Sequence, residues 1–570
     1  MKKYLLVLAG LYCVLSYALA EHPDYPELKK SDANIIGHVL DKKTKEHLPY
    51  ITIALKGTTI GTVTDATGHY FLKNLPEGNF ILEVSSVGYK TVTRNVTLKK
   101  GKTLEEDFEI EEDAIALDGV VVSANRSETT RRLAPTLVNV VDLKLFETTN
   151  SSTLSQGLNF QPGVRVETNC QNCGFQQVRI NGLDGPYTQI LIDSRPVFSA
   201  LSGVYGLEQI PASMIERVEV MRGGGSALFG SSAIAGTINI ITKEPLRNSG
   251  QLSHTLTALG GGSSFDNNTS LNASLVTDDH RAGLYIFGQN RHRSGYDYDG
   301  DGFTELPKLK NQTVGFRSYL KTSTYSKLTF EYHHMQEFRR GGDMLDRPPH
   351  EAHIAEQLQH SIDGGSLKFD YFSPDEKNRL SIFASAANTD RDSYYGPGND
   401  PLKAYGKTTD LTAMGGAQYV HTFDKCFFMP SDLTAGLEYN RDRLKDNMWG
   451  YDRHTDQTVN IYSAFLQNEW KNDRWGILIG GRLDKHNMVD NVIFSPRANL
   501  RFNPTQNINL RLSYSSGFRA PQAFDEDMHI ENVGGTVAMI ERAKNLKEEK
   551  SQSFSASADM YHRFGAFQTN

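Results

Sequence analysis

The chain has 570 residues, of which 38% are hydrophobic, 22% charged and 10% aromatic, and its formal net charge is −7. At roughly 100–200 residues per domain this length allows three or four units, and a chain this polar is not a bundle of membrane-spanning helices. The mild acidity argues against a nucleic-acid binder, which normally carries a basic face. Glycine (49), Phe (28) and Tyr (25) are abundant and Trp (3) is rare, which indicates β-structure with many turns.

The N-terminus has the features of an export signal. Lys2 and Lys3 precede an apolar stretch that ends at Leu15, and residues 18–20 (Ala-Leu-Ala) supply the small side chains of a cleavage site. About a dozen apolar residues are short for crossing a bilayer, so residues 1–20 are predicted to be a cleaved secretory signal and not an anchor.

Three cysteines follow this signal: Cys170 and Cys173, spaced as Cys-x-x-Cys, and Cys426. In an exported protein the pair at 170 and 173 is predicted to form a small disulfide. A zinc site is disfavoured because no second Cys/His pair lies nearby at ligand spacing. A redox-active thiol is a further alternative, although the βαβ surroundings of a thioredoxin-type motif are missing.

Turn signals and periodicity divide the next part of the chain into three regions. Residues 34–112 contain short strand-like runs separated by Gly, Pro, Asn and Asp, the pattern of a small all-β sandwich. Residues 113–126 form a linker with a β-prone end. Residues 127–245 mix helix-like stretches with strands around the glycine triplet at 223–225, which predicts a compact α+β domain. The loop after that triplet lacks the lysine of a phosphate-binding loop.

From about residue 250 to residue 570 the apolar side chains recur at every second position. In one such segment Leu510 and Leu512 alternate with Asn509 and Arg511. About fourteen segments of this kind approach the roughly 9–11 residues of a tilted membrane strand. Their connections alternate between short turns and long loops, which favours a transmembrane barrel. A water-soluble sandwich, whose strands alternate too, is the competing interpretation.

Several stretches resemble a known family. Residues 178–197 (VRINGLDGPYTQILIDSRPV) and 215–245 (IERVEVMRGGGSALFGSSAIAGTINIITKEP) resemble signature sequences in the plug of TonB-dependent outer-membrane receptors. Residues 517–521 (GFRAP) resemble a motif of their barrels, and residues 35–110 resemble the carboxypeptidase-regulatory-like sandwich. The resemblance implies a mainly β protein in which a small β-sandwich is followed by an α+β plug inside an antiparallel transmembrane β-barrel. The sandwich and the plug would lie on the periplasmic side of the outer membrane.

The family also implies a transporter and not an enzyme. Such receptors import a scarce, large solute of the iron-siderophore, haem or cobalamin class, and the TonB–ExbB–ExbD complex supplies the energy. Residues 117–124 resemble the TonB box, which would add a strand to TonB if it were extended and accessible. A last strand of the sandwich or a plain linker is the alternative. The TonB-binding residues implied are Leu117, Asp118, Val120, Val121 and Val122.

Four charged residues, Glu216, Arg217, Glu219 and Arg222, fall where the family often places charges that lock the plug against the barrel wall. Ion pairs in a solvated interface contribute about 0–1 kcal/mol each, which suits an element that must be dislodged. The alternative is a solvated strand face.

A calcium-like pattern occurs at Asp297, Asp299 and Asp301, which alternate before a glycine turn. Lys308 stands where an EF-hand would have its bidentate Glu, so an EF-hand is excluded. A structural calcium in a looser loop and a plain acidic loop are both open, and no other cofactor is required.

A second candidate region, residues 333–360, is rich in the imidazole and thioether side chains that bind transition metals. His350 and His353 in this region are candidate contacts to haem or a transition metal. The chain has 17 histidines, so chance clustering competes with this hypothesis. The stretch at 544–547 lacks the proline of the motif expected downstream in haem receptors, which leaves haem specificity open.

The barrel region falls short of the family's size, because about fourteen strands are fewer than the 22 of plugged outer-membrane transporters. An open barrel would leave two unpaired edges in hydrocarbon, where each unsatisfied backbone group costs several kcal/mol. We therefore expect the sequence to be a fragment or a truncated reading frame. An importer of oligosaccharide or peptide working with a lid lipoprotein, and a secreted β-rich adhesin, are the competing functions.

Overall fold

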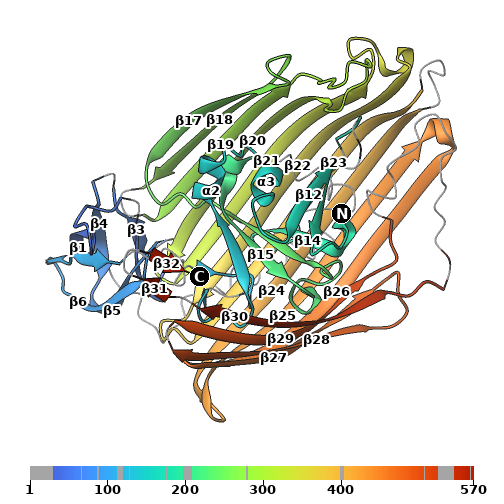
Figure 1. Cartoon of the computed structure of the whole chain (residues 1–570). Coiled ribbons are helices and arrows are strands. Elements are labelled where there is room, and N and C mark those ends of the chain that lie inside the picture. Colours follow the sequence, from blue (N-terminus) through green and yellow to red (C-terminus); the bar gives the residue numbers. More distant parts are fainter. Residues whose placement is uncertain are drawn as a thin grey trace.

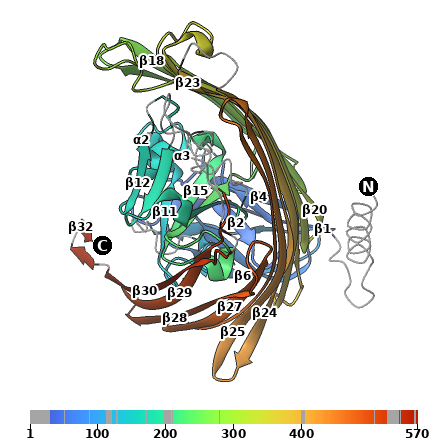
Figure 2. The same ribbon diagram turned by 90° about the vertical axis from the view of Figure 1, so that its right-hand side faces the viewer.

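Three β-rich units follow one another along the chain: a small sandwich, a mixed plug and a large curved sheet that wraps part-way around the plug (Figures 1 and 2). The structure is a computed structural model. It describes residues 30–111, 120–196, 208, 210–397, 404–523, 543 and 545–569, except 50, 66, 87–88, 127–128, 169, 171, 175, 278–279, 506, 561 and 565–566. The predicted signal at residues 1–20 lies outside these residues. No helix among the described residues combines the length and the apolar character that crossing a bilayer requires.

The first unit is a sandwich of two four-stranded sheets. Its inward-facing side chains, such as Ile35, Ile53 and Leu82, are fully buried between the sheets, so the predicted β-sandwich is confirmed. One sheet contains β1 (Lys30–Asp41), β4 (His69–Pro76), β7 (Thr103–Glu105) and β8 (Phe108–Ile110). The other contains β2 (Thr52–Leu55), β3 (Gly61–Val63), β5 (Gly78–Ser85) and β6 (Val92–Leu98).

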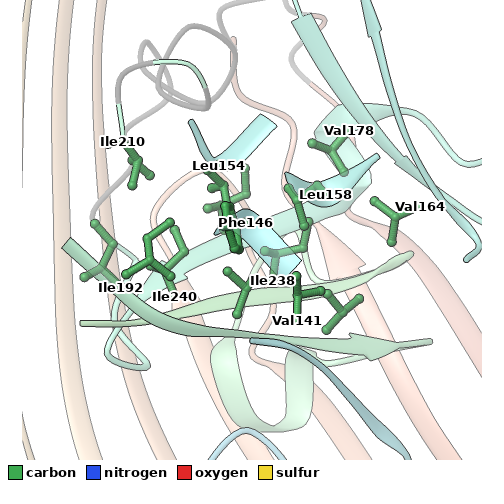
Figure 3. Packing of buried hydrophobic residues seen from close by; sticks show 14 of the residues in the cluster. Val141, Phe146, Leu154, Leu158, Val164, Val178, Ile192, Ile210, Ile238 and Ile240 are labelled. Carbon is green, nitrogen blue, oxygen red and sulfur yellow. The ribbon is translucent and has the colours of Figure 1, made fainter. Parts of the chain in front are cut away.

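The second unit, the plug, is built on a four-stranded sheet of order β11-β15-β16-β14. Two short helices lie over this sheet, and Figure 3 shows Phe146 and Leu154 from these helices packing with Ile238 and Ile240 of β16. The sheet strands are β11 (Val138–Asp142), β14 (Thr188–Ile192), β15 (Ile215–Arg222) and β16 (Gly236–Thr242). The remaining plug elements are β9 (Val120–Val121), β10 (Thr129–Thr130), α2 (Leu143–Thr148), α3 (Leu154–Leu158), β12 (Val164–Thr168), β13 (Gln176–Ile180), η1 (Gly185–Tyr187), η2 (Ala212–Met214) and α5 (Ser226–Phe229).

The third unit, called the wall below, is one antiparallel sheet of 14 strands in which each strand pairs with its neighbours in sequence. The number of strands agrees with the prediction. Within the described residues β17 and β30 are its two edges. The strands are β17 (Ser249–Leu259), β18 (Ser264–Val276), β19 (Ala282–Arg293), β20 (Lys308–Ser323), β21 (Ser326–Gly342), β22 (Ile354–Phe372), β23 (Asn378–Pro397), β24 (Tyr405–Cys426), β25 (Met429–Met448), β26 (Arg453–Lys471), β27 (Trp475–His486), β28 (Ile493–Thr505), β29 (Ile508–Arg519) and β30 (Glu549–Met560). Short elements outside it are η3 (Pro349–Glu351), η4 (Trp449–Tyr451), β31 (His562–Phe564) and β32 (Phe567–Thr569).

The wall has its polar side chains inside and its apolar side chains outside. On β29, Leu512 is 57% exposed, whereas its neighbour Arg511 is 3% exposed. Phe554 on β30 is 75% exposed, and the guanidinium groups of Arg339 and Arg482 are fully buried on the inner side. A water-soluble protein would bury the apolar side chains and expose the polar ones. The pattern of the wall is therefore that of a membrane barrel and not of a soluble sandwich.

The two ends of the wall differ. Residues 324–325 and 373–377 form short turns at one end, called the short-turn end, and residues 294–307 and 343–353 form longer connections at the other, the long-loop end. The sandwich docks at the short-turn end, where the backbone N–H of Thr59 donates to the carbonyl of Thr324 at 2.9 Å.

Candidate functional site: the plug and its contacts with the wall

Buried ion pairs hold the plug to the inner face of the wall. Glu208 of the plug lies 2.8 Å from Arg339, 3.4 Å from Arg291 and 3.7 Å from Arg293, all of them arginines on inward-facing positions of wall strands. Burial raises the pKa of Glu208, but Arg339, Arg293 and Arg291 together outweigh burial and lower that pKa to about 2. The carboxylate is therefore charged at neutral pH and is compensated from the wall.

A second group of plug acids meets the wall near the end of the plug sheet. Asp193, which directly follows β14, pairs with Arg317 of β20. Glu244, which follows β16, lies 2.9 Å from Lys327 and 3.7 Å from Arg317. The ammonium group of Lys327 is the largest cause that holds the pKa of Glu244 down, at about 2. Two independent sets of charges thus join the plug to the wall.

Residues 120–126, called the connecting segment below, enter the plug beneath β15. Glu219, a fully buried residue of β15, accepts hydrogen bonds from the backbone N–H groups of Val122 (2.9 Å) and Ser123 (2.8 Å) through one carboxylate oxygen. Asn239 of β16 donates to the Ser123 hydroxyl at 3.0 Å. The segment is therefore held by side chains of the plug sheet.

The same segment also contacts the wall. Arg126 lies 2.5 Å from Glu438 of β25, and the Asn125 side chain donates to Glu469 of β26 at 2.7 Å. Arg497 of β28 donates to the Ala124 carbonyl at 2.9 Å. A displacement of the connecting segment would therefore disturb both the plug sheet and the wall.

The predicted TonB box overlaps the start of this segment. Leu117 and Asp118 lie outside the described residues. Val120 and Val121 form β9, which pairs with Thr130 and Thr129 of β10, and the Val121 side chain is fully buried. The expectation that the box is extended holds for these two valines, whereas the expectation that it is accessible is wrong for Val121 in this conformation, because the plug packs over it.

The four residues of the predicted charge lock lie on β15, and their role as a lock stays a prediction. Arg217 pairs with Glu216 at 2.8 Å and with Glu219 at 2.9 Å, and Arg222 donates to the Pro162 carbonyl. The contacts shown for these four residues are thus within the plug and to the connecting segment. The physical reason is that β15 is an inner strand of the plug sheet, paired on both edges. The plug acids that pair with the wall, Asp193, Glu208 and Glu244, lie outside this strand.

The predicted disulfide between Cys170 and Cys173 is not formed in this structure. The Cys170 thiol instead donates to the Glu356 carboxylate of β22 at 3.0 Å. Cys173 is fully buried in a cluster with Leu358 and Tyr395 of the wall. The loop that carries the two cysteines is therefore packed against the wall.

The acidic loop between β19 and β20 brings its carboxylates together. One oxygen from each of Asp297, Asp299, Asp301 and Glu305 lies within 4.8 Å of the others, close enough to hold a metal ion. The Asp297 carboxylate also accepts hydrogen bonds from the Gly300 and Gly302 amides at 2.7 and 2.9 Å. Glu305 was missed because its position does not match an EF-hand glutamate, and calcium in this loop stays a prediction.

The two candidate haem or metal histidines lie on the connection between β21 and β22. The Nδ1 atom of His350 lies 2.8 Å from the Tyr405 hydroxyl, and that of His353 lies 2.5 Å from the Asp343 carboxylate. Each is held by a different partner, and neither belongs to a cluster of potential metal ligands among the described residues. Their role as ligands stays a prediction.

The plug acids that reach the wall were not found from the sequence. Asp193 and Glu244 stand in loops and Glu208 stands at a helical position, and none of the three belongs to a recognisable motif. One signal was available on the wall side, because Arg291, Arg317 and Arg339 occupy inward positions on the consecutive strands β19, β20 and β21, where a charge needs a partner.

Three family models match consecutive parts of the chain. Residues 35–122 match the CarboxypepD_reg-like domain, residues 130–237 match the TonB-dependent receptor plug domain, and residues 238–570 match the TonB-dependent receptor-like β-barrel. The last match alone spans more than half of the chain.

Individual relatives point the same way. The chain is 25% identical over 424 residues to the vitamin B12 transporter BtuB of Vibrio vulnificus strain CMCP6, which covers 72% of this chain and 64% of that protein. The siderophore receptor PirA from Acinetobacter baumannii has a TM-score of 0.63 and 19% identity, over 75% of this chain and 69% of its own. A variant of the ferric enterobactin receptor PfeA from Pseudomonas aeruginosa has a TM-score of 0.58 and 19% identity, over 69% and 63%. These structural likenesses establish the fold, and the chain spans less than two thirds of the length of the curated relative.

Proposed function

The chain belongs to the TonB-dependent receptor family, and we propose that it acts in the energy-coupled import of a scarce, large solute across the outer membrane. The observation that carries the proposal is the plug, held by buried charges against a wall that is polar inside and apolar outside. An adhesin has no need of a polar interior that encloses a separate domain.

The solute proposed is a metal chelate or a cobalamin-type molecule. The relatives named above are a vitamin B12 transporter, a siderophore receptor and a ferric enterobactin receptor, which supports this class over oligosaccharides and peptides. Solutes of this class are large and scarce, so uptake needs both specific binding and a source of energy.

The outward apolar side chains would contact lipid, and the sandwich at the short-turn end would face the periplasm. TonB of the TonB–ExbB–ExbD complex would pair with residues 117–122 by strand addition, in which backbone hydrogen bonds supply most of the strength. Because Val121 is packed into the plug, TonB would first pair with the residues that precede Val121. A pull on that part would then load the hydrogen bonds that Val122 and Ser123 make to Glu219.

The charged contacts suit such a mechanism. Salt bridges between plug and wall lose their attraction when water enters, because a higher dielectric weakens them and solvates the separated charges. An apolar interface would instead resist wetting. The plug can thus be held firmly when dry and be released by a pull that admits water.

The test is uptake in a strain in which the gene is deleted. We expect the wild-type gene to restore growth when an iron chelate, haem or cobalamin is the limiting nutrient. Leu117→Pro should abolish this growth, because proline removes a backbone donor from the strand that TonB would bind. Leu117→Thr is the matched control and should keep it. Equal growth with the proline and threonine variants would exclude strand addition by TonB at this position. Growth of the deletion strain on all three nutrients without the restored gene would exclude the import function.

A further inference from the structure

The described part of the loop between β12 and β13 reverses tightly around its two cysteines. The Gly174 amide donates to the Cys170 carbonyl at 3.0 Å, and Gly174 has a φ of +69°, which glycine adopts without steric cost. The Cys173 backbone N–H points at the Cys170 sulfur, at 3.4 Å. A hydrogen bond to sulfur favours the thiolate, which is the form that binds metals.

The wall supplies a third potential ligand to this loop. Glu356 lies near the long-loop end of β22, and its carboxylate accepts a hydrogen bond from the Cys170 thiol at 3.0 Å. One ligand atom from each of Cys170, Cys173 and Glu356 lies within 4.8 Å of the other two. Glu356 is only 2% exposed and Cys173 is fully buried, whereas Cys170 is half-buried.

Close backbone packing holds the loop in this place. A Cβ atom added at Gly341 of β21 would lie 1.8 Å from the Asn172 carbonyl oxygen, so only glycine permits the loop to lie this close to the wall. Arg339 of the same strand donates to the Gly174 carbonyl at 3.3 Å. The positions of the two sulfurs relative to Glu356 are therefore set by wall contacts to the loop backbone at Asn172, between the two cysteines, and at Gly174, directly after them.

We propose that Cys170, Cys173 and Glu356 form a binding site for a thiophilic divalent cation of the zinc class. Two thiolates and one carboxylate are ligands that Zn²⁺ accepts, and three protein ligands leave a fourth tetrahedral position for water or another donor. The half-buried Cys170 gives that position access to solvent. Soft thiolates disfavour Mg²⁺ and Ca²⁺, which prefer oxygen.

Binding at this site would replace the protons of the two thiols and release them to solvent. It would also join the plug to the wall at the long-loop end, since two ligands come from the plug and one from β22. The proposal goes beyond import, because it concerns metal binding by the purified chain and needs neither TonB nor a transported solute.

The experiment is a titration of the full 570-residue chain in detergent micelles with Zn²⁺ alone, and in parallel with Co²⁺. We expect one equivalent of tightly bound Zn²⁺ and a thiolate-to-cobalt charge-transfer band. Cys170→Ser and Cys173→Ser should abolish both signals. Glu356→Gln, which keeps the shape of the side chain, should weaken binding by roughly ten-fold or more, since even residues that only orient metal ligands contribute 10–100-fold. Cys426→Ser is the matched control and should change nothing.

Two results would exclude a metal site at the two cysteines. One is Zn²⁺ uptake that persists in the double variant lacking both Cys170 and Cys173, which would place the metal elsewhere. The other is mass spectrometry of protein isolated with a thiol-blocking reagent in which these two cysteines are joined as a disulfide and no metal is bound. A charge-transfer band that is unchanged in Glu356→Gln, together with unchanged affinity, would remove Glu356 from the site and with it the link between plug and wall.

Discussion

The hydrogen bonds from the connecting segment to Glu219 should control how easily that segment leaves the plug. Both backbone N–H groups, of Val122 and Ser123, donate to the same oxygen of a fully buried carboxylate. Glu219→Ala removes both bonds and leaves two buried donors without their acceptor. At about 1.5 kcal/mol for each bond to a charged group, the free energy that opposes opening should fall by about 3 kcal/mol. Since about 1.4 kcal/mol is a factor of ten, local opening should become roughly 100-fold more frequent.

Two further variants separate charge from shape. Glu219→Gln keeps an oxygen that can accept both bonds but loses the charge, which roughly halves their strength, so opening should increase by about ten-fold. Glu216→Gln is the matched control. Glu216 also pairs with Arg217, but its side chain is 45% exposed, and the contact shown for it does not involve the connecting segment. This variant should leave opening unchanged.

The assay is hydrogen exchange of the Val122 and Ser123 amides, read by mass spectrometry in detergent micelles. Exchange through local opening reports the opening equilibrium directly. These two amides should exchange fastest in Glu219→Ala and more slowly in Glu219→Gln. Glu216→Gln and the wild type should exchange equally and slowest. If Glu219→Ala leaves the exchange of these two amides unchanged, Glu219 does not hold the segment and the proposed route of force through it is refuted.

Further predictions concern the other charges and the outer face. Glu208→Gln removes a buried carboxylate that three wall arginines share. Arg291 keeps Asp266 and Arg339 keeps Glu337, but Arg293 loses the acidic partner shown for it. Plug docking should therefore weaken by about 3–5 kcal/mol, measured as a lower urea midpoint for plug release, and an unchanged midpoint would contradict the role of this cluster. The wall arginines lower the pKa of Glu208 to about 2, so the contribution of Glu208 to plug docking should be complete above pH ~4.5 and should be lost as the pH falls towards 2. A docking free energy of the wild-type protein that stays constant between pH ~4.5 and ~2 would contradict this role of Glu208. Calcium should protect loop 294–307 from proteolysis in wild type and not in Asp297→Asn, and equal cleavage with and without calcium would remove the calcium site. Leu437→Arg, on an outward position that is 66% exposed, should destabilise insertion into bilayers by about 2–4 kcal/mol, and unaltered insertion would show that this face does not meet lipid.

The sequence by itself determined the strands and their two faces. A period of two is a local property, so residues such as Leu510, Leu512 and Arg511 show that one face is apolar and the other polar without reference to any partner. The same alternation predicted about fourteen strands, and the structure has 14 in one sheet. The plug was identified by long sequence stretches that resemble a family, which is also local information.

Only the tertiary structure decided which charges and thiols meet. Asn125 and Glu469 are 344 positions apart, and Cys170 and Glu356 are 186 positions apart. Their contacts depend on how the plug sits against a curved sheet, and no spacing along the chain records that placement. The charges on β15 had a recognisable motif yet pair inside the plug, whereas Glu208 had no motif and meets three arginines of the wall. The reason is physical: periodicity follows from the geometry of a single strand, but a buried charge is compensated by whichever opposite charge the packing of two separate units brings within reach.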